Sequence, residues 1–147
     1  MYSVIIYSSP LYIPLSFAVH TWVEINSPDH GPERFEIHAV INKKTGNYFY
    51  LNSKKSGEGM SLFALPDIWY GKKYFNSKVL YKDEGMQAQD TVLKIHNMVN
   101  NYMHKNKYIT FPGPNSNTFT QWIIDNFLAD KNIKLPFNAF GKNFMKN

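Results

Sequence analysis

Cysteine is absent from the 147 residues of the chain. Its absence excludes disulfide bonds, zinc sites built on cysteine and a thiol nucleophile. A chain without disulfides fits a reducing compartment, so we expect the protein to be cytoplasmic. The sequence also has no phosphate-binding glycine loop and no closely spaced metal-ligand motif such as HExxH. We therefore expect no cofactor.

A long uninterrupted apolar segment is missing as well. The most apolar stretch, residues 1–20, contains no lysine or arginine, and Pro10 and Pro14 interrupt it. This stretch is a poor match to a signal peptide and is too broken for a transmembrane helix. We expect a strand, a loop and a second strand there, and no transmembrane segment. Peripheral contact with a membrane stays open.

Acidic residues are outnumbered by basic ones, and the formal net charge is +5. Several lysines occur in adjacent pairs beside turn-forming residues, at 43–44, 54–55 and 72–73. A protein that binds nucleic acid usually concentrates its positive charge on one face or one helix. Scattered pairs are more typical of a solvated surface, so we expect no binding to nucleic acid. The substrate stays open between a small molecule, a peptide and a lipid-like compound.

Two kinds of periodicity divide the chain. Residues 17–25 and 34–41 alternate between apolar and polar side chains, which predicts two half-buried strands. Residues 87–104 and the segment after Asn115 place apolar side chains at helical spacing, which predicts two amphipathic helices. Further short strands are expected at residues 48–51, 60–70, 77–81 and 107–111. We therefore expect one α+β domain over residues 1–147, with an antiparallel sheet and two main helices.

Pairing the first two strands as a hairpin centred near Asp29 predicts which side chains meet. In that register Glu24 faces Arg34, which is a favourable cross-strand pair of opposite charge. Both apolar faces then lie on the same side of the sheet, as a buried face requires. Two further pairs are predicted on the opposite, polar face: Trp22 with Glu36, and His20 with His38.

A polar segment, PGPNSN, precedes the second helix. Residues 112–114 force a turn, and Asn115 or Ser116 can cap the helix by accepting a hydrogen bond from a nearby backbone amide. The same position suits chemistry, because a nucleophile at a helix N-terminus lies among N–H groups that can hold an oxyanion. A serine there needs a nearby base, and His20 is the candidate. The segment is therefore either a cap alone or a cap beside a catalytic serine.

Four motifs, FAVHTW, WYG, PGPNSNTF and LPFNAFGKNF, occur in this order between Phe17 and Phe144. Together they resemble a bacterial family known only as a domain of unknown function that carries a PGPNSNTF box. The box and the HTW motif also resemble the circularly permuted papain-like proteins related to the NlpC/P60 amidases and lecithin–retinol acyltransferase. There, a histidine on an early strand serves a cysteine at a late helix start. The resemblance implies a papain-like fold with His20 as the base and Ser116 in place of the cysteine.

The resemblance also implies the remaining roles. The third polar residue usually lies on the strand after the histidine, which indicates His38 or, as the alternative, Glu36. Asn115 and Asn117 would position the site, and the backbone amides of Ser116 and Asn117 would hold the oxyanion. The activity implied is hydrolysis or acyl transfer at an amide, ester or thioester bond. Apart from the resemblance, three aromatic residues are expected in the groove: Trp22, Trp69 and Tyr70. For Trp69 and Tyr70, simple packing stays open as the alternative.

Two other interpretations stay open. A serine hydroxyl is not ionised near neutral pH, so the absence of the cysteine also fits an inactive papain-like module that binds a peptide, a glycan or a lipid headgroup. His20 and His38 with Glu36 would also make a pair-plus-carboxylate metal site, although no ligand motif supports it.

Overall fold

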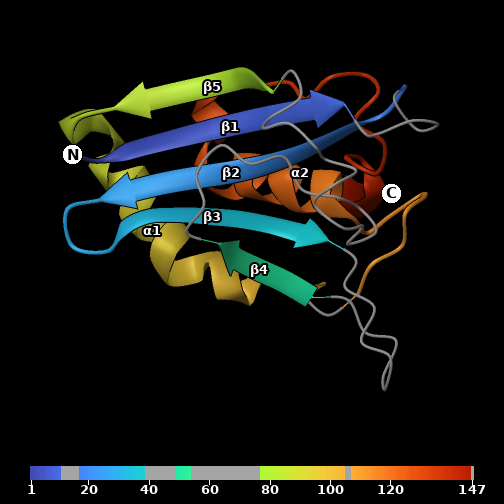
Figure 1. Cartoon of the computed structure of the whole chain (residues 1–147), viewed down its shortest axis with the longest axis horizontal. Helices are drawn as coiled ribbons and strands as arrows, with labels where there is room; N and C mark the ends of the chain where they lie inside the picture. Colours follow the sequence, from blue (N-terminus) through green and yellow to red (C-terminus); the bar gives the residue numbers. More distant parts are fainter. Residues whose placement is uncertain (11–16, 39–48, 54–76, 105–106, 147) are drawn as a thin grey trace, which may run out of the picture.

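The computed structural model describes residues 1–10, 17–38, 49–53, 77–104 and 107–146. Five strands in these residues form one antiparallel sheet, and the two main helices cover one of its faces (Figure 1). The strands are β1 (Ser3–Pro10), β2 (Val19–Ser27), β3 (Gly31–His38), β4 (Phe49–Ser53) and β5 (Lys78–Glu84). The helices are α1 (Gln89–Met98) and α2 (Ser116–Phe127). The predicted α+β class, with an antiparallel sheet and two main helices, is confirmed.

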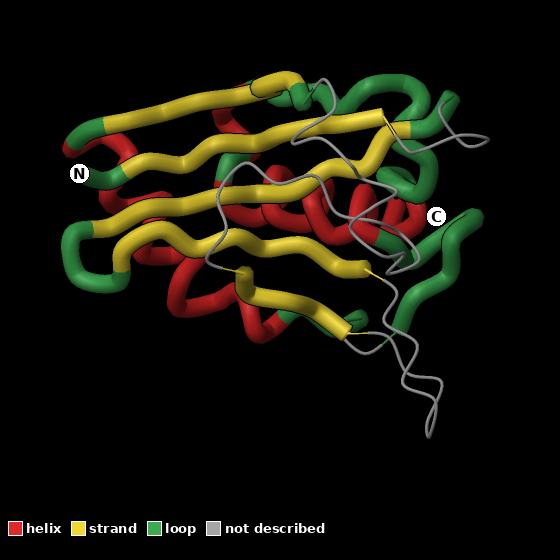
Figure 2. Tube along the Cα trace, in the orientation of Figure 1, coloured by secondary structure: helices red, strands yellow, loops and turns green. Residues whose placement is uncertain are grey.

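The strand order across the sheet is β4-β3-β2-β1-β5. The first four strands follow one another as neighbours, whereas β5 crosses to the far edge and pairs with β1. Figure 2 shows both helices behind the sheet, where α2 contacts β2 and β3. The central strand β2 therefore lies directly against the helix that begins at Ser116.

The hydrophobic core lies between the sheet and the two helices. The strands contribute Val4, Ile6, Val23, Ile25, Phe35 and Ile37, and the helices contribute Val92, Ile95, Phe119 and Ile123. Among the described residues, the apolar positions of β2 and β3 thus enter the core on the same side of the sheet, as a period of two requires. Phe17 is the exception, because it precedes β2 and is 62% exposed.

The β2–β3 hairpin has the predicted register at its charged pair. Glu24 lies opposite Arg34. Gly31 ends the turn with a φ of 71°, a left-handed conformation that glycine adopts without strain. Both strands reach further into the loop than predicted, β2 to Ser27 and β3 from Gly31. The end of the second predicted strand, residues 39–41, lies outside the described residues.

The polar face of β2 is buried as well, so the expectation of a half-buried strand is wrong for it. His20, Trp22 and Glu24 are 2%, 0% and 6% exposed. A strand buried on both faces needs partners for its polar groups, because an unpaired buried charge is costly. This face is where the polar network described below lies.

The first helix and the last strand differ in extent from the prediction. Instead of one helix over residues 87–104, α1 lies between two 3-10 turns, Met86–Ala88 and Val99–Asn101. The strand expected at residues 77–81 is present as β5 and continues to Glu84. No helix in the described ranges combines the length and the apolar character needed to cross a membrane. Of the other predicted strands, 48–51 overlaps β4 and 60–70 lies outside the described residues.

The strand predicted at residues 107–111 is wrong. This segment is irregular, and Ile109 donates its N–H to the carbonyl of Pro114 at 2.8 Å. The turn at residues 112–114 folds the chain back on itself, so this backbone group bonds within the loop and not to a sheet.

Candidate functional site

The helix that carries Ser116 is capped by Asn115. The backbone of Asn115 is extended, and its side-chain oxygen accepts the N–H groups of Asn117 at 3.0 Å and Thr118 at 3.2 Å. The Thr118 hydroxyl oxygen accepts the N–H of Asn115 at 3.0 Å, which completes a capping box. Of the two predicted cap residues, Asn115 is the cap. Ser116 is the first residue of α2, and its hydroxyl is not used for capping.

Two asparagines fix the start of α2 to β2 and to the C-terminal tail. Asn117 Nδ2 donates to the carbonyls of Val19 at 2.8 Å and Phe140 at 2.9 Å. Asn117 Oδ1 accepts the hydroxyl of Thr21 at 2.9 Å. Asn115 Nδ2 donates to the same Phe140 carbonyl at 3.1 Å. The two side chains therefore hold three distant parts of the chain together.

The tail approaches this cluster closely at Gly141. Thr118 Oγ1 donates to the Gly141 carbonyl at 2.7 Å. The φ of Gly141 is 90°, and a Cβ at this position would collide with the Asn115 side chain. Glycine is therefore needed here both for the backbone conformation and for the close approach.

Ser116 is buried, with 2% of its surface exposed, and its hydroxyl donates to the carbonyl of Thr21 at 2.5 Å. Between Ser116 and His20, both of which the structure describes, no hydrogen bond is present. The Ser116 hydroxyl is therefore bonded to the backbone of β2 and not to His20.

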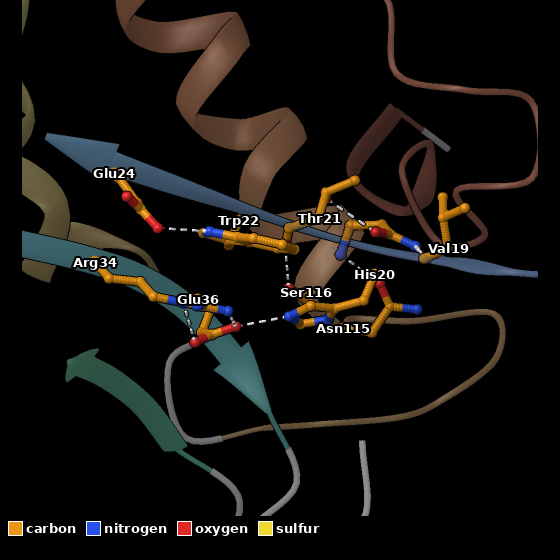
Figure 3. A network of polar contacts seen from close by, with 10 residues as sticks. Val19, His20, Thr21, Trp22, Glu24, Arg34, Glu36, Asn115 and Ser116 are labelled. Carbon is orange, nitrogen blue, oxygen red and sulfur yellow. Dashed lines mark hydrogen bonds and ion pairs between the residues drawn. The ribbon is translucent and has the colours of Figure 1, made fainter. Parts of the chain in front are cut away.

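His20 belongs to a buried ionic network with Glu36 and Arg34 (Figure 3). His20 Nε2 lies 2.6 Å from Glu36 Oε2, and Arg34 approaches the same carboxylate with Nε at 2.7 Å and Nη2 at 3.0 Å. All three side chains are at most 1% exposed. Of the two residues predicted to orient His20, Glu36 contacts it. His38 is the last residue of β3, and its side chain lies outside the described part of the chain.

The Glu36 carboxylate stays ionised although it is buried. Burial alone would raise the pKa of Glu36, but the hydrogen bond and charge of His20, followed by the charge of Arg34, outweigh it and hold the pKa below the usual 4.5. The ionised carboxylate therefore accepts a hydrogen bond from the Nε2–H of His20. Nδ1 of His20 has no hydrogen-bond partner among the described residues. The network therefore fixes the ring through Nε2 and leaves its second nitrogen unused.

Trp22 packs against the Arg34 side of this network. Its ring stacks on Tyr7 with the centroids 5.2 Å apart, and the Arg34 guanidinium lies 4.3 Å from its centroid. Trp22 Nε1 donates to Glu24 Oε1 at 3.0 Å. Because Trp22 is fully buried and does not line the cavity beside His20, its predicted role as a groove residue is corrected to a packing role.

A cavity of about 300 Å³ lies beside His20 and the start of α2. Its polar lining consists of His20, Thr110, Asn115, Ser116 and Asn117. Its apolar lining consists of Phe17, Ala18, Val19, Tyr108, Phe111 and Phe140. The structure thus brings His20 and the whole Asn-Ser-Asn segment to one cavity. The apolar lining was not predicted, because it joins the start of β2 to two distant irregular segments, around Phe111 and Phe140.

Two other predicted site residues, Trp69 and Tyr70, lie outside the described residues. In the described part of the chain, no group of three or more histidine, aspartate or glutamate side chains is placed to hold a metal ion. Arg34 was missed as a member of the site. Its position on the same strand face as Glu36, two residues earlier, was the available signal.

The fold and the site define an α+β protein with a buried His–Glu–Arg network beside a largely apolar cavity. The chain belongs to the family described as "Protein of unknown function (DUF3750)", whose model matches residues 2–144. Neither the curated proteins nor the solved structures contain a match to the chain. The predicted membership of a family of unknown function is confirmed.

Proposed function

We propose that the cavity beside His20 is an acyl-transfer site, with Ser116 as nucleophile, His20 as general base and Glu36 as the residue that orients the imidazole. The reaction would be hydrolysis or acyl transfer at an amide, ester or thioester bond. The observation that carries the proposal is the state of His20. Its Nε2 is held by Glu36 at 2.6 Å, its Nδ1 has no partner among the described residues, and it lines the same cavity as Ser116.

The chemical steps follow the logic of a serine–histidine–carboxylate site. Ser116 Oγ attacks the acyl carbonyl carbon while its proton passes to His20 Nδ1, and Glu36 stabilises the imidazolium. The tetrahedral intermediate then collapses, and the leaving group takes the proton from His20 and departs as an amine, alcohol or thiol. Water or an acceptor attacks the acyl-serine and gives its proton to His20. The acyl product leaves as Ser116 Oγ regains that proton.

The backbone at the start of α2 supplies one candidate group for the oxyanion. The first N–H groups of a helix have no intrahelical acceptor, so the N–H of Ser116 is suited to this role. The N–H of Asn117, to which we also assigned this role from the sequence, is already bonded to Asn115 Oδ1 at 3.0 Å. An oxyanion at Asn117 would therefore compete with the helix cap.

The order of these residues supports the proposed relationship to circularly permuted papain-like proteins. The histidine lies on the early strand β2, the carboxylate on the next strand β3, and the candidate nucleophile at the start of the late helix α2. Serine stands where that group has cysteine. A hydroxyl needs more help from its base than a thiol does, and the ionised Glu36 behind His20 provides that help.

The hydrogen bond from Ser116 to the Thr21 carbonyl favours a second candidate function. In this candidate Ser116 only ties α2 to β2, and the cavity binds a peptide, a glycan or a lipid headgroup without reacting with it. The two functions differ in one measurable property, because only the enzyme has an activated Ser116.

Labelling with an alkyl fluorophosphonate tests the proposed enzyme. This probe phosphonylates activated serines, and intact-mass spectrometry followed by peptide mapping locates the modification. We expect one modification, at Ser116, which Ser116→Ala abolishes. Ser27→Ala, which removes another buried serine (4% exposed), should leave it unchanged. A folded protein that stays unmodified would favour the binding module.

A further inference from the structure

The apolar side of the cavity carries a further inference, which rests on the proposed function. We propose that the site takes an uncharged aliphatic acyl group of medium length. The acyl chain would lie among the phenylalanine rings that line the cavity, and its carbonyl would face Ser116 and His20.

Three phenylalanine rings lie together along this cavity. Phe140 packs edge-on against Phe17 with the centroids 6.2 Å apart, and against Phe111 at 6.3 Å. Phe17 and Phe111 are 62% and 72% exposed, so this cluster of rings presents apolar surface to solvent. An apolar chain that enters between these rings removes them from water, which is favourable. The rings therefore favour a hydrocarbon occupant.

The charge distribution argues against an ionised substrate. In the described part of the chain, no aspartate, glutamate, lysine or arginine lines the cavity. The nearby charges of Glu36 and Arg34 are paired with each other at 2.7 Å. An ionised ligand group would lose its hydration without gaining a counter-charge, which is costly. Free amino acids, carboxylates and phosphates are therefore poor candidates for the part of the substrate that enters.

Besides the hydroxyl of Thr110, few polar atoms are left for a ligand. The amide groups of Asn115 and Asn117 are spent on the helix cap, on β2 and on the tail. His20 Nδ1 is buried without a partner, and Ser116 Oγ is held by a single bond to Thr21. A ligand with one carbonyl group can satisfy its hydrogen bonds with so few polar atoms. A glycan with many hydroxyl groups cannot.

The size of the cavity limits the length of the chain. Ligand pockets range from about 300 to about 1,000 Å³, and this cavity, at about 300 Å³, lies at the small end. A medium-length acyl chain fits that space better than the long chain of a membrane lipid.

Binding of octanamide to the Ser116→Ala variant, measured by calorimetry, tests the inference without turnover. Each methylene buried from water improves affinity about fourfold, the equivalent of about 0.8 kcal/mol. We therefore expect octanamide to bind at least about 100-fold more tightly than acetamide. Octylammonium, which has the same chain and a charge, should bind more weakly than octanamide.

Two exposed phenylalanines provide a matched pair of variants. Phe111 lines the cavity and is 72% exposed, whereas Phe137 is 88% exposed and does not line it. Because both rings are largely in solvent, neither change should unfold the protein. In the Ser116→Ala background, Phe111→Ala should weaken octanamide binding several-fold, and Phe137→Ala should not. Equal affinities for octanamide and acetamide would overturn the inference.

The two proposals fail in different ways. Fluorophosphonate labelling of Ser116 without any preference for octanamide would keep the enzyme and overturn the aliphatic substrate. Octanamide binding without labelling of Ser116 would support the apolar ligand and overturn the catalytic function. Labelling together with tight octanamide binding would support both.

Discussion

His20 on β2 and Glu36 on β3 are joined by a hydrogen bond of 2.6 Å inside the protein. Arg34 lies on the other side of the same carboxylate, at 2.7 Å. Because these side chains are removed from water, the Glu36 carboxylate depends on both partners to stay ionised. The bond occupies Nε2 of His20 and leaves Nδ1, the atom on which the proposed chemistry depends, without a partner among the described residues.

Removing the carboxylate of Glu36 should destabilise the fold. Glu36→Gln removes the carboxylate that contacts the buried Arg34 guanidinium at 2.7 Å, and breaking a buried ion pair costs about 3–5 kcal/mol of unfolding free energy. Urea denaturation followed by circular dichroism measures the loss. The matched control is Glu84→Gln, which removes a carboxylate that is 41% exposed and pairs with Lys82. The control should lose less than about 1 kcal/mol, and equal losses would contradict the buried network.

The stability of the protein should depend on pH through Glu36. Its pKa in the folded state lies below the usual 4.5, so its contribution is complete above that value and is lost as the pH falls through the folded-state pKa. Carboxyl-carbon NMR of glutamate-labelled protein measures this pKa directly. We expect the Glu36 signal to stay that of a carboxylate at a pH of about 4.5, where free glutamate is half protonated. Titration at or above the ordinary value would be inconsistent with the pairing.

Asn117→Ala should loosen the start of α2. The change leaves the carbonyls of Val19 and Phe140 and the hydroxyl of Thr21 without a bond they now make. Buried polar groups without partners cost about 1–3 kcal/mol each, so we expect a loss of at least about 2 kcal/mol in urea denaturation. Asn126→Ala removes an exposed side-chain bond to a backbone carbonyl and should change stability by less than about 0.5 kcal/mol. A similar small change in both variants would show that Asn117 does not hold the start of α2 to β2 and the tail.

Alanine substitutions at two glycines distinguish the cost of backbone strain from the cost of a steric collision. Gly31 and Gly141 have φ values of 71° and 90°, so alanine is strained at either position. A Cβ at Gly31 meets nothing within 4 Å, whereas a Cβ at Gly141 collides with Asn115. Gly31→Ala should cost about 1 kcal/mol, and Gly141→Ala should cost clearly more in thermal or urea unfolding. If Gly141→Ala were the milder change, the tail would not pack against the cap as described.

The features that were predicted from the sequence depend on local patterns. Alternation and charge complementarity over a short loop were enough to place Glu24 opposite Arg34. The polar residues before an apolar helix were enough to place a cap within one residue, at Asn115. Glu36 was named only as the alternative partner of His20, because facing and diagonal neighbours on adjacent strands are both within reach of long side chains.

The features that were missed depend on distant packing. The Ser116 hydroxyl bonds to the carbonyl of Thr21, 95 positions earlier, and no local pattern records that contact. Asn117 reaches the Phe140 carbonyl in an irregular tail that has no periodicity. Trp22 was expected in a groove, but the Arg34 guanidinium covers its face. The contacts of Ser116 and Asn117 therefore determine which of their polar atoms remain available in the cavity.

Thiol reactivity of Ser116→Cys tests the coupling between position 116 and His20 most directly. The thiolate is the form that iodoacetamide alkylates, and a free cysteine has a pKa of about 8.5. The measurement is the alkylation rate across pH, compared between Ser116→Cys and Ser116→Cys with His20→Gln, after circular dichroism shows both folded. If the second variant does not fold, His20→Asn replaces it.

The proposed site predicts that His20 assists ionisation of the introduced thiol. Alkylation of Ser116→Cys should then reach half its maximum rate well below a pH of about 8.5, and removing His20 should return the midpoint toward that value. Comparing midpoints and not absolute rates cancels the slow access to a position that is 2% exposed in the native protein. The same pH profile in both folded variants would contradict the coupling between position 116 and His20. The PGPNSN segment would then serve only to cap α2 and hold it to its neighbours.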